Sequence, residues 1–182
     1  VGLLTRNILI KTERPGVTKA SLEAVGSKNM RKFAHTMYMH GSKGNVQFAE
    51  FKYMGHYGKL GRYPIHAHQM LETSRGMILR GNGLWYTGFR WINPHNSQGI
   101  LIEDNVGFSS VNSGYFVEND SNLSSNKDVA FVHNLGVETM GKTFADRGTG
   151  PGEYWRVTTF WPSSVKQGAS GGPEGASALG NV

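Results

Sequence analysis

Two histidines, His66 and His68, stand two positions apart in a short stretch of the sequence. Residues two apart on a β-strand point to the same face, about 7 Å from one another. Such a pair suits two ligands of one divalent metal ion, and zinc or iron fits imidazole better than calcium does. A metal site needs at least one more ligand, and the sequence offers Glu118, His95 and His133. The alternative is a pair of structural histidines that hydrogen-bond to neighbouring turns.

Carboxylates form a second group of candidates, at Glu103, Asp104 and Glu118. Hydrolysis of a glycosidic bond uses two carboxyl groups about 5 to 9 Å apart. Adjacent residues on a strand point to opposite faces, so Glu103 and Asp104 are a poor pair. Glu118 combined with Asp104 is geometrically freer. The alternative is that these carboxylates only solvate one face of the fold.

Arginines and aromatic residues together give a mixture that suits an acidic polysaccharide. A guanidinium pairs a uronate carboxylate through two parallel hydrogen bonds, and an aromatic ring can stack against a sugar. The residues concerned are Arg6, Arg80, Arg90, Trp85, Tyr86, Trp91 and Tyr115. The same mixture suits single-stranded nucleic acid, and about half of these aromatic rings would instead fill the core. His95 follows Asn93-Pro94, a sequence typical of a turn.

Short strands must position these residues, because the apolar segments are brief and rich in β-branched and aromatic side chains. Similar phrases begin at Val46, Met77, Ile100 and Val129. Strands that recur every two to three dozen residues indicate a solenoid of β-coils, whose stacking buries a continuous core. The expected inward pairs are Val46 and Phe48, Met77 and Leu79, Ile100 and Ile102, and Val129 and Phe131. One short helical turn is expected over 18–25.

An asparagine follows three of the predicted strands, at Asn82, Asn105 and Asn134. Asparagine tolerates the left-handed conformation, so we expect each to turn a corner of the coil. Stacked copies are also expected to hydrogen-bond to one another along the solenoid axis.

The composition agrees with one mostly β-structured domain. The chain has 182 residues, 25 glycines, no cysteine and a formal net charge of +6. Glycine disfavours helices, and no apolar run approaches the ~20 residues of a membrane span. The basic residues are dispersed along the chain, so we expect a modestly basic surface and no nucleic-acid partner. We divide the chain into a β-helix section over 1–166 and a flexible tail rich in Gly, Ala and Ser over 167–182.

Several phrases resemble one known family, the cell-migration-inducing and transmembrane hyaluronidases with the fibrocystin-like proteins. The opening stretch 1–10 resembles the start of their β-helix, and Tyr63-Pro64-Ile65-His66-Ala67-His68 resembles their Tyr-Pro-Ile-His-Phe-His motif. Val132-His133-Asn134-Leu135-Gly136 and Thr158-Thr159-Phe160-Trp161 follow in the family's order. Ala67 replaces an aromatic residue, and Ser113 stands where the family favours histidine.

The resemblance implies a right-handed, single-stranded parallel β-helix of the pectin-lyase-like type. It also implies an extracellular or cell-surface setting and, as in some members, binding or depolymerisation of hyaluronan. The spacing of His66 and His68, considered by itself, adds a divalent metal ion as a candidate cofactor. On this hypothesis Glu118, His66 and His68 are catalytic, and the substrate-binding residues are Arg90, Trp91, Trp85, His95 and Asp104. The alternative is a non-catalytic structural or adhesion module of a cell-surface protein.

Overall fold

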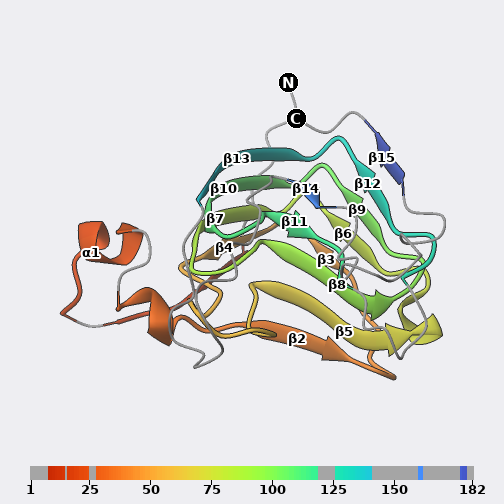
Figure 1. The fold of residues 1–182 in the computed structure, drawn as a ribbon, viewed down its shortest axis with the longest axis horizontal. Coiled ribbons are helices and arrows are strands. Elements are labelled where there is room, and N and C mark those ends of the chain that lie inside the picture. The colour runs from red at the N-terminus through yellow and green to blue at the C-terminus, as the bar shows by residue number, and fades with distance from the viewer. Residues whose placement is uncertain are drawn as a thin grey trace, which may run out of the picture.

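Fifteen short strands form three parallel sheets in the computed structural model, which describes residues 8–14, 16–24, 28–118, 126–140, 160–161 and 177–179 (Figure 1). Sheet I contains β1 (Ile8–Lys11), β4 (Ala49–Lys52), β7 (Gly83–Thr87), β10 (Val106–Val111) and β13 (Leu135–Met140). Sheet II contains β2 (Thr36–Met39), β5 (Ile65–Leu71), β8 (Ile92–Ser97), β11 (Tyr115–Phe116) and β14 (Phe160–Trp161). Sheet III contains β3 (Val46–Gln47), β6 (Ile78–Arg80), β9 (Leu101–Glu103), β12 (Ala130–Val132) and β15 (Ser177–Leu179).

Each coil of the chain contributes one strand to each sheet, in the order sheet II, sheet III, sheet I. Strands β5, β6 and β7 form one coil, and β8, β9 and β10 form the next coil, paired with it in parallel. The chain is therefore a single-stranded parallel β-helix, as the sequence predicts. Strand β15 comes from the stretch that the sequence assigns to the tail, and most of that tail lies outside the described residues.

The corner between sheets III and I is built in the same way in four successive coils. One residue at this corner has a positive φ in every coil, namely Phe48, Gly81, Asp104 and His133. The next residue begins the turn into sheet I. That residue is alanine in the first coil, Ala49, and asparagine in the other three.

The three asparagines form a buried ladder along the axis. Asn82 Nδ2 donates to Asn105 Oδ1 over 3.0 Å, and Asn105 Nδ2 donates to Asn134 Oδ1 over 2.9 Å. The predicted ladder is confirmed. The predicted left-handed conformation belongs instead to the residue before each asparagine, because the asparagine side chain must point inward to reach the next coil.

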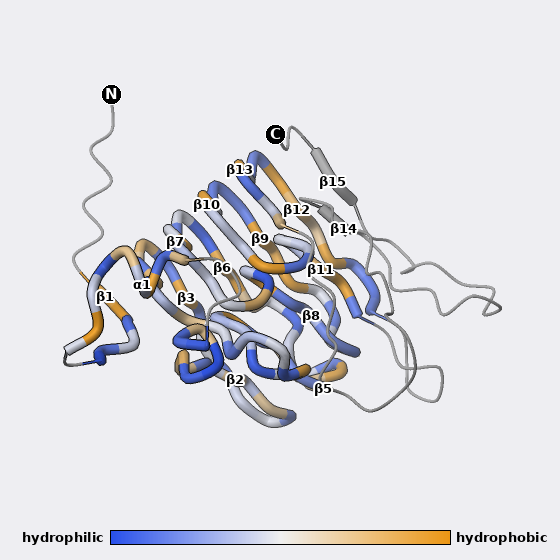
Figure 2. Tube along the Cα trace, turned by 60° about the vertical axis from the view of Figure 1, so that its left-hand side comes forward, coloured by the Kyte–Doolittle hydropathy of each residue, from blue (hydrophilic) through white to orange (hydrophobic). Residues whose placement is uncertain are grey.

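Apolar stretches recur along successive coils (Figure 2), and the buried ones form one core of columns that run from coil to coil. One such column in sheet III contains Val46, Leu79, Ile102 and Phe131. The expected burial of Phe48 is wrong, because Phe48 lies at the left-handed corner and is 43% exposed. The predicted register of the first phrase is wrong by two residues, since Val46 pairs with Leu79 and not with Met77.

One inward column of sheet I ends in a glycine. Phe51 and Leu84 stack in it, and Gly107 takes the next position. A Cβ placed on Gly107 would overlap Cδ2 and Cε3 of Trp91, whose side chain is fully buried. The glycine is needed here because the indole fills the space that a side chain would occupy.

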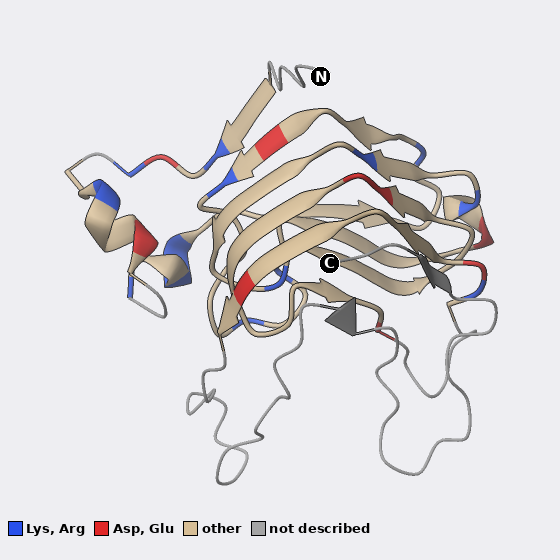
Figure 3. Ribbon diagram, turned by 90° about the horizontal axis from the view of Figure 1, so that it is seen from above, with Lys and Arg blue, Asp and Glu red and all other residues tan. Residues whose placement is uncertain are grey.

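The segment before β2 carries the short helices and lies to one side of the coil stack (Figure 1). Helix α1 (Lys19–Glu23) is capped by Thr18, whose hydroxyl accepts from the Ser21 amide, and it confirms the helical turn expected there. The 3₁₀ helix η1 (Met30–Lys32) helps to form a second, smaller core. A further 3₁₀ helix, η2 (Glu72–Ser74), follows β5. Figure 3 shows several Lys and Arg residues along this N-terminal segment, whereas most of each strand carries no charged residue.

Candidate functional site

The outer face of sheet II carries four of the residues that the sequence singles out for chemistry, His66, His68, His95 and Glu118. Strand alternation turns Ile65 and Ala67 into the core, so His66 and His68 point outward. The parallel register places His95 of β8 beside His68, and Glu118 forms the next bridge beside His95. Three successive coils therefore align two columns of polar side chains along this face.

Three imidazoles converge on this face. The ring centroids of His66 and His68 are 4.9 Å apart, those of His68 and His95 are 5.0 Å apart, and those of His66 and His95 are 5.9 Å apart. One nitrogen from each ring lies within 4.8 Å of the other two. His66 is fully buried and His95 is 8% exposed, whereas His68 is half-buried, so the cluster meets solvent mainly at His68.

The tautomer of His66 follows from one hydrogen bond. Its Nδ1 lies 2.8 Å from the carbonyl oxygen of Gly61, which can only accept, so Nδ1 carries the proton. The Nε2 lone pair is then available, and Nε2 is buried with no hydrogen-bond partner among the described residues. Burial, together with His68 and His95 nearby, lowers the pKa of His66 to about 3, so the ring is neutral at physiological pH.

A buried ion pair borders the imidazoles. Arg90 is fully buried, and its Nη1 donates to Glu118 Oε2 over 2.8 Å, to the Tyr63 hydroxyl over 2.9 Å and to Asn93 Oδ1. The guanidinium carbon also lies 3.6 Å from the centroid of the Phe116 ring. These contacts fix the position of the guanidinium.

Glu118 keeps its negative charge in this setting. Burial alone would raise the pKa of Glu118, but the Arg90 guanidinium and then His95 favour the ionised form. The pKa of Glu118 therefore lies below its usual value. The sequence suggests that Arg90 contacts a substrate carboxylate, but the structure directs its charge to Glu118 instead, so we assign Arg90 a positioning role.

The tryptophans expected to stack against sugar lie elsewhere. Trp91 is fully buried in the main core against Tyr115, at 5.2 Å between ring centroids, so we leave it out of the proposed binding surface. Trp85 is half-buried on sheet I, where its ring lies 6.0 Å from that of Phe108. It therefore belongs to a different face of the solenoid from His66.

The remaining predicted residues occupy the corner between sheets III and I. Asp104 and His133 both have positive φ there, and His133 Nδ1 lies 3.9 Å from Asp104 Oδ1. Arg80 pairs with Glu103 of the next coil at 2.6 Å. Asp104 and His133 are therefore not neighbours of the imidazole cluster, and among the described residues His95 is the third histidine. Arg6, the other arginine singled out above, lies outside the described residues.

The donor set of the cluster fits a transition metal ion. Three neutral imidazole nitrogens are typical of zinc sites that keep a fourth position open, and they also suit iron, copper and nickel. A metal-binding nitrogen needs a lone pair that carries no proton. The buried Nε2 of His66 has such a lone pair and has no hydrogen-bond partner among the described residues. Gly61 holds the His66 ring from outside the cluster, as supporting hydrogen bonds to metal-binding histidines commonly do.

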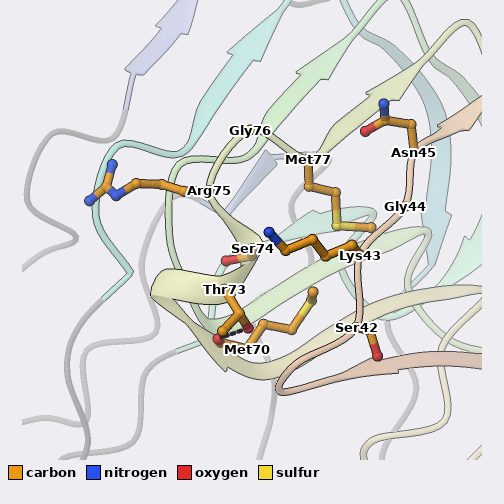
Figure 4. A pocket seen from close by; sticks show the side chains of 10 residues that line it. All are labelled: Ser42, Lys43, Gly44, Asn45, Met70, Thr73, Ser74, Arg75, Gly76 and Met77. Carbon is orange, nitrogen blue, oxygen red and sulfur yellow. Dashed lines mark hydrogen bonds between the residues drawn. The ribbon is translucent and has the colours of Figure 1, made fainter.

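A separate pocket of about 210 Å³ opens near the corner between sheets II and III (Figure 4). Lys43, Met70, Ser74, Arg75 and Met77 are among the residues that line it. The Arg75 side chain points away from the other lining residues, and it pairs with Glu72 and Asp128. The pocket contains none of the imidazoles, so we do not place the chemistry there.

Sequence analysis missed two members of the site, Tyr63 and Asn93. Tyr63 stands three residues before His66 in the same motif, and Asn93 stands two residues before His95. The spacing of two places Asn93 on the same face of the sheet as His95, which strand periodicity could have indicated. Tyr63 precedes β5, so its approach to Arg90 depends on the loop before that strand. The involvement of Gly61 depends on loop conformation, and the sequence carries no indication of it.

Comparison with known proteins adds a family to this geometry. The family model described as CEMIP beta-helix matches residues 32–160. The chain is 28% identical over 150 residues to "Cell surface hyaluronidase CEMIP2" of Homo sapiens, a match that covers 79% of this chain and 10% of that protein. It is 32% identical over 127 residues to "Cell migration-inducing and hyaluronan-binding protein" of Mus musculus, covering 65% of this chain and 9% of that protein. Fibrocystin-L of Homo sapiens matches at 28% over 75 residues, 41% of this chain and 2% of that protein. The chain thus spans a tenth or less of the length of these curated relatives.

Proposed function

The chain belongs to the CEMIP beta-helix family, and we propose that it binds and depolymerises an acidic polysaccharide of the hyaluronan type on the outer face of sheet II. The names of its relatives, a cell surface hyaluronidase and a hyaluronan-binding protein, support this substrate class. They also support an extracellular or cell-surface setting. Within the described part of the chain, no helix is long and apolar enough to span a membrane.

One observation carries the proposal, the convergence of three imidazoles beside a carboxylate held by Arg90. Cleavage of a glycosidic link needs groups that move protons and groups that stabilise developing charge. The ionised Glu118 can accept a proton, whereas Arg90 is engaged in holding Glu118 in place. Asp104 lies on another face, so Glu118 and Asp104 do not form the carboxylate pair of a conventional glycosidase.

We further propose that His66, His68 and His95 hold a divalent metal ion, with Zn²⁺ as the first candidate. The nitrogens that would bind it already lie within 4.8 Å of one another. Such an ion, when bound, polarises an oxygen of the substrate or acidifies a bound water. Glu118 lies in the next coil beside His95, where its carboxylate can accept a proton from the substrate or from water.

A depolymerisation assay tests the proposed function. The chain is incubated with long hyaluronan, with added Zn²⁺ or with a chelator, and viscosity and new reducing ends are followed. We expect shortening with Zn²⁺, little with the chelator, and loss of activity in His66→Ala and His68→Ala. His133→Ala removes an exposed imidazole from another face and should cleave like the wild type. A wild-type chain that leaves hyaluronan intact with each of Zn²⁺, Fe²⁺ and Mn²⁺ would contradict depolymerisation.

A second candidate function is a non-catalytic structural or adhesion module. The complete burial of His66, Arg90 and Asn93 favours it, because buried polar networks also rigidify a fold. The two functions differ in one result. A structural centre would stabilise the fold when Zn²⁺ binds and would leave hyaluronan intact, whereas a catalytic centre would stabilise the fold and also cleave hyaluronan.

A further inference from the structure

Basic residues that are dispersed in the sequence gather in one place in the fold. Arg31 and His35 come from the segment around η1, and His56, Lys59 and Arg62 come from the loop between β4 and β5. We call these five residues the cationic loop patch. Arg31 and Lys59 are exposed and the other three residues are half-buried, so all five are at least partly accessible to solvent.

Backbone hydrogen bonds hold the two segments together. The Tyr57 amide donates to the Met30 carbonyl over 3.0 Å, and the Gly55 amide donates to the Ala34 carbonyl over 2.7 Å. Within the loop, the His56 amide donates to the Arg62 carbonyl over 2.9 Å. The two backbone segments that carry the patch are therefore held in a fixed position relative to each other.

Within the part of the chain that the structure describes, Lys59 and Arg62 supply positive charge to the patch. Lys59 and Arg62 take part in none of the described ion pairs. Burial and then Arg62, Lys59, His35 and Arg31 lower the pKa of His56, so the charged neighbours that act on it are all cationic. Burial and Arg62 likewise lower the pKa of His35. Lys59 and Arg62 therefore contribute a positive potential at this point of the surface.

The patch adjoins the imidazole cluster through Gly61. The Gly61 carbonyl accepts the Nδ1–H of His66, and a Cβ on Gly61 would lie 3.9 Å from His66 Cε1 and from Met37 Cε. Arg62 follows Gly61 directly, and Tyr63, the next residue, contacts Arg90 and Glu118. One loop therefore carries part of the positive patch at one end and part of the candidate site at the other.

We propose that the cationic loop patch binds the carboxylates of an acidic polysaccharide and holds the chain against the outer face of sheet II. The proposal rests on the proposed function and names where the substrate's negative charge is bound. A sparsely charged polymer fits better than nucleic acid, for two reasons. The two histidines are mostly neutral at pH 7, and Tyr57, the aromatic ring beside the patch, is buried with Arg31 over it, so it offers no exposed platform for bases.

The test is direct binding of hyaluronan oligosaccharides to the chain at low and moderate salt. The double variant Lys59→Gln/Arg62→Gln removes two charges from the patch. The matched control Lys43→Gln/Lys127→Gln removes two charges near the corner of sheets II and III. Uncharged chitin oligosaccharides and a single-stranded DNA serve as comparison ligands, and circular dichroism checks that each variant is folded.

We expect the patch variant to bind hyaluronan about tenfold more weakly than the wild type, since two solvent-exposed charge contacts are lost. The control variant should bind like the wild type, salt should weaken wild-type binding, and chitin oligosaccharides should bind poorly to all three proteins. Equal affinity of the patch variant and the wild type would overturn the patch while leaving depolymerisation intact. Equal losses in both variants, or tighter binding of DNA than of hyaluronan, would also overturn it. Binding through the patch without any cleavage would refute only the proposed depolymerisation.

Discussion

Trp91 and Gly107 occupy one space in the solenoid core, because the buried indole lies where a side chain at position 107 would stand. Gly107 does not have a positive φ, so an alanine there meets only a steric obstacle. We expect Gly107→Ala to lower the free energy of unfolding by about 1–3 kcal/mol, the usual cost of overpacking. Urea denaturation measures it. Gly44→Ala, at an exposed glycine with no atom within 4 Å, should change stability little, and an equal loss in the two variants would refute the packing argument.

The asparagine ladder gives a second prediction. Asn105 donates to the Leu79 carbonyl and to Asn134, and its Oδ1 accepts from Asn82, all without access to water. Asn105→Ala leaves several buried groups unpaired and should cost about 2–4 kcal/mol in chemical denaturation. Asn45, whose Oδ1 accepts one bond from the Ile78 amide at an exposed position, is the comparison. If Asn45→Ala proves as costly, the ladder has no special role.

Two arginine–glutamate ion pairs join successive coils and differ in burial, so they show how burial changes the contribution of an ion pair to stability. Arg90–Glu118 has a fully buried guanidinium, whereas both partners of Arg80–Glu103 are partly exposed. Glu118→Gln leaves the Arg90 charge buried without its counter-charge and should cost about 3 kcal/mol. Glu103→Gln should cost less than about 1 kcal/mol. Thermal and urea unfolding measure both, and the reverse order would show that Arg90 does not depend on Glu118.

The histidines of the cationic loop patch predict how stability depends on pH. Burial and then Arg62 lower the pKa of His35 and of His56 in the folded state, with further cations acting on His56. The unfolded chain, with its usual histidine pKa near 6.5, therefore binds protons more readily. The free energy of unfolding should rise with pH up to the histidine pKa of the unfolded chain, and it should fall as the pH drops below that pKa. Urea melts between pH 5 and pH 8 should show a shallower slope for His35→Gln/His56→Gln than for the wild type, and an unchanged slope would contradict the prediction.

Metal binding should be visible without any substrate. At a free Zn²⁺ concentration 100 times the dissociation constant, one site adds about 2.7 kcal/mol to the free energy of unfolding. We expect Zn²⁺ to raise the melting temperature of the wild type and of His133→Ala, and a chelator to reverse the effect. His95→Ala should remove the response, because His95 brings the third imidazole into the cluster. A similar Zn²⁺ response in His95→Ala would place the metal elsewhere.

Strand periodicity predicted much of this architecture. The inward positions of three coils, the stacked asparagines and the shared face of His66 and His68 all follow from alternation within strands and repetition between coils. The predicted register of the first coil against the second is wrong by two residues, because Phe48 looks like a core residue in the sequence. Only the backbone shows that this position is a left-handed corner.

Features that depend on loops and on contacts between coils were less predictable. The sequence shows Arg31, Lys59 and Arg62 as dispersed charges, and only the docking of one loop on η1 brings them together. The role of Arg90 was also beyond sequence reasoning. A guanidinium suited to a substrate carboxylate is equally suited to Glu118, and the fold of residues 112–118 decides between the two.

The stacking register of sheet II has a consequence for local unfolding. His66 and His68, then His95, and then Glu118 belong to three consecutive coils, so no single coil contains the site. In a solenoid, coils can separate from one end while the others stay folded. The constellation therefore exists only while the β5–β8 and β8–β11 interfaces are both closed. The fraction of molecules in which these side chains are brought together therefore measures how cooperatively the middle of the solenoid folds.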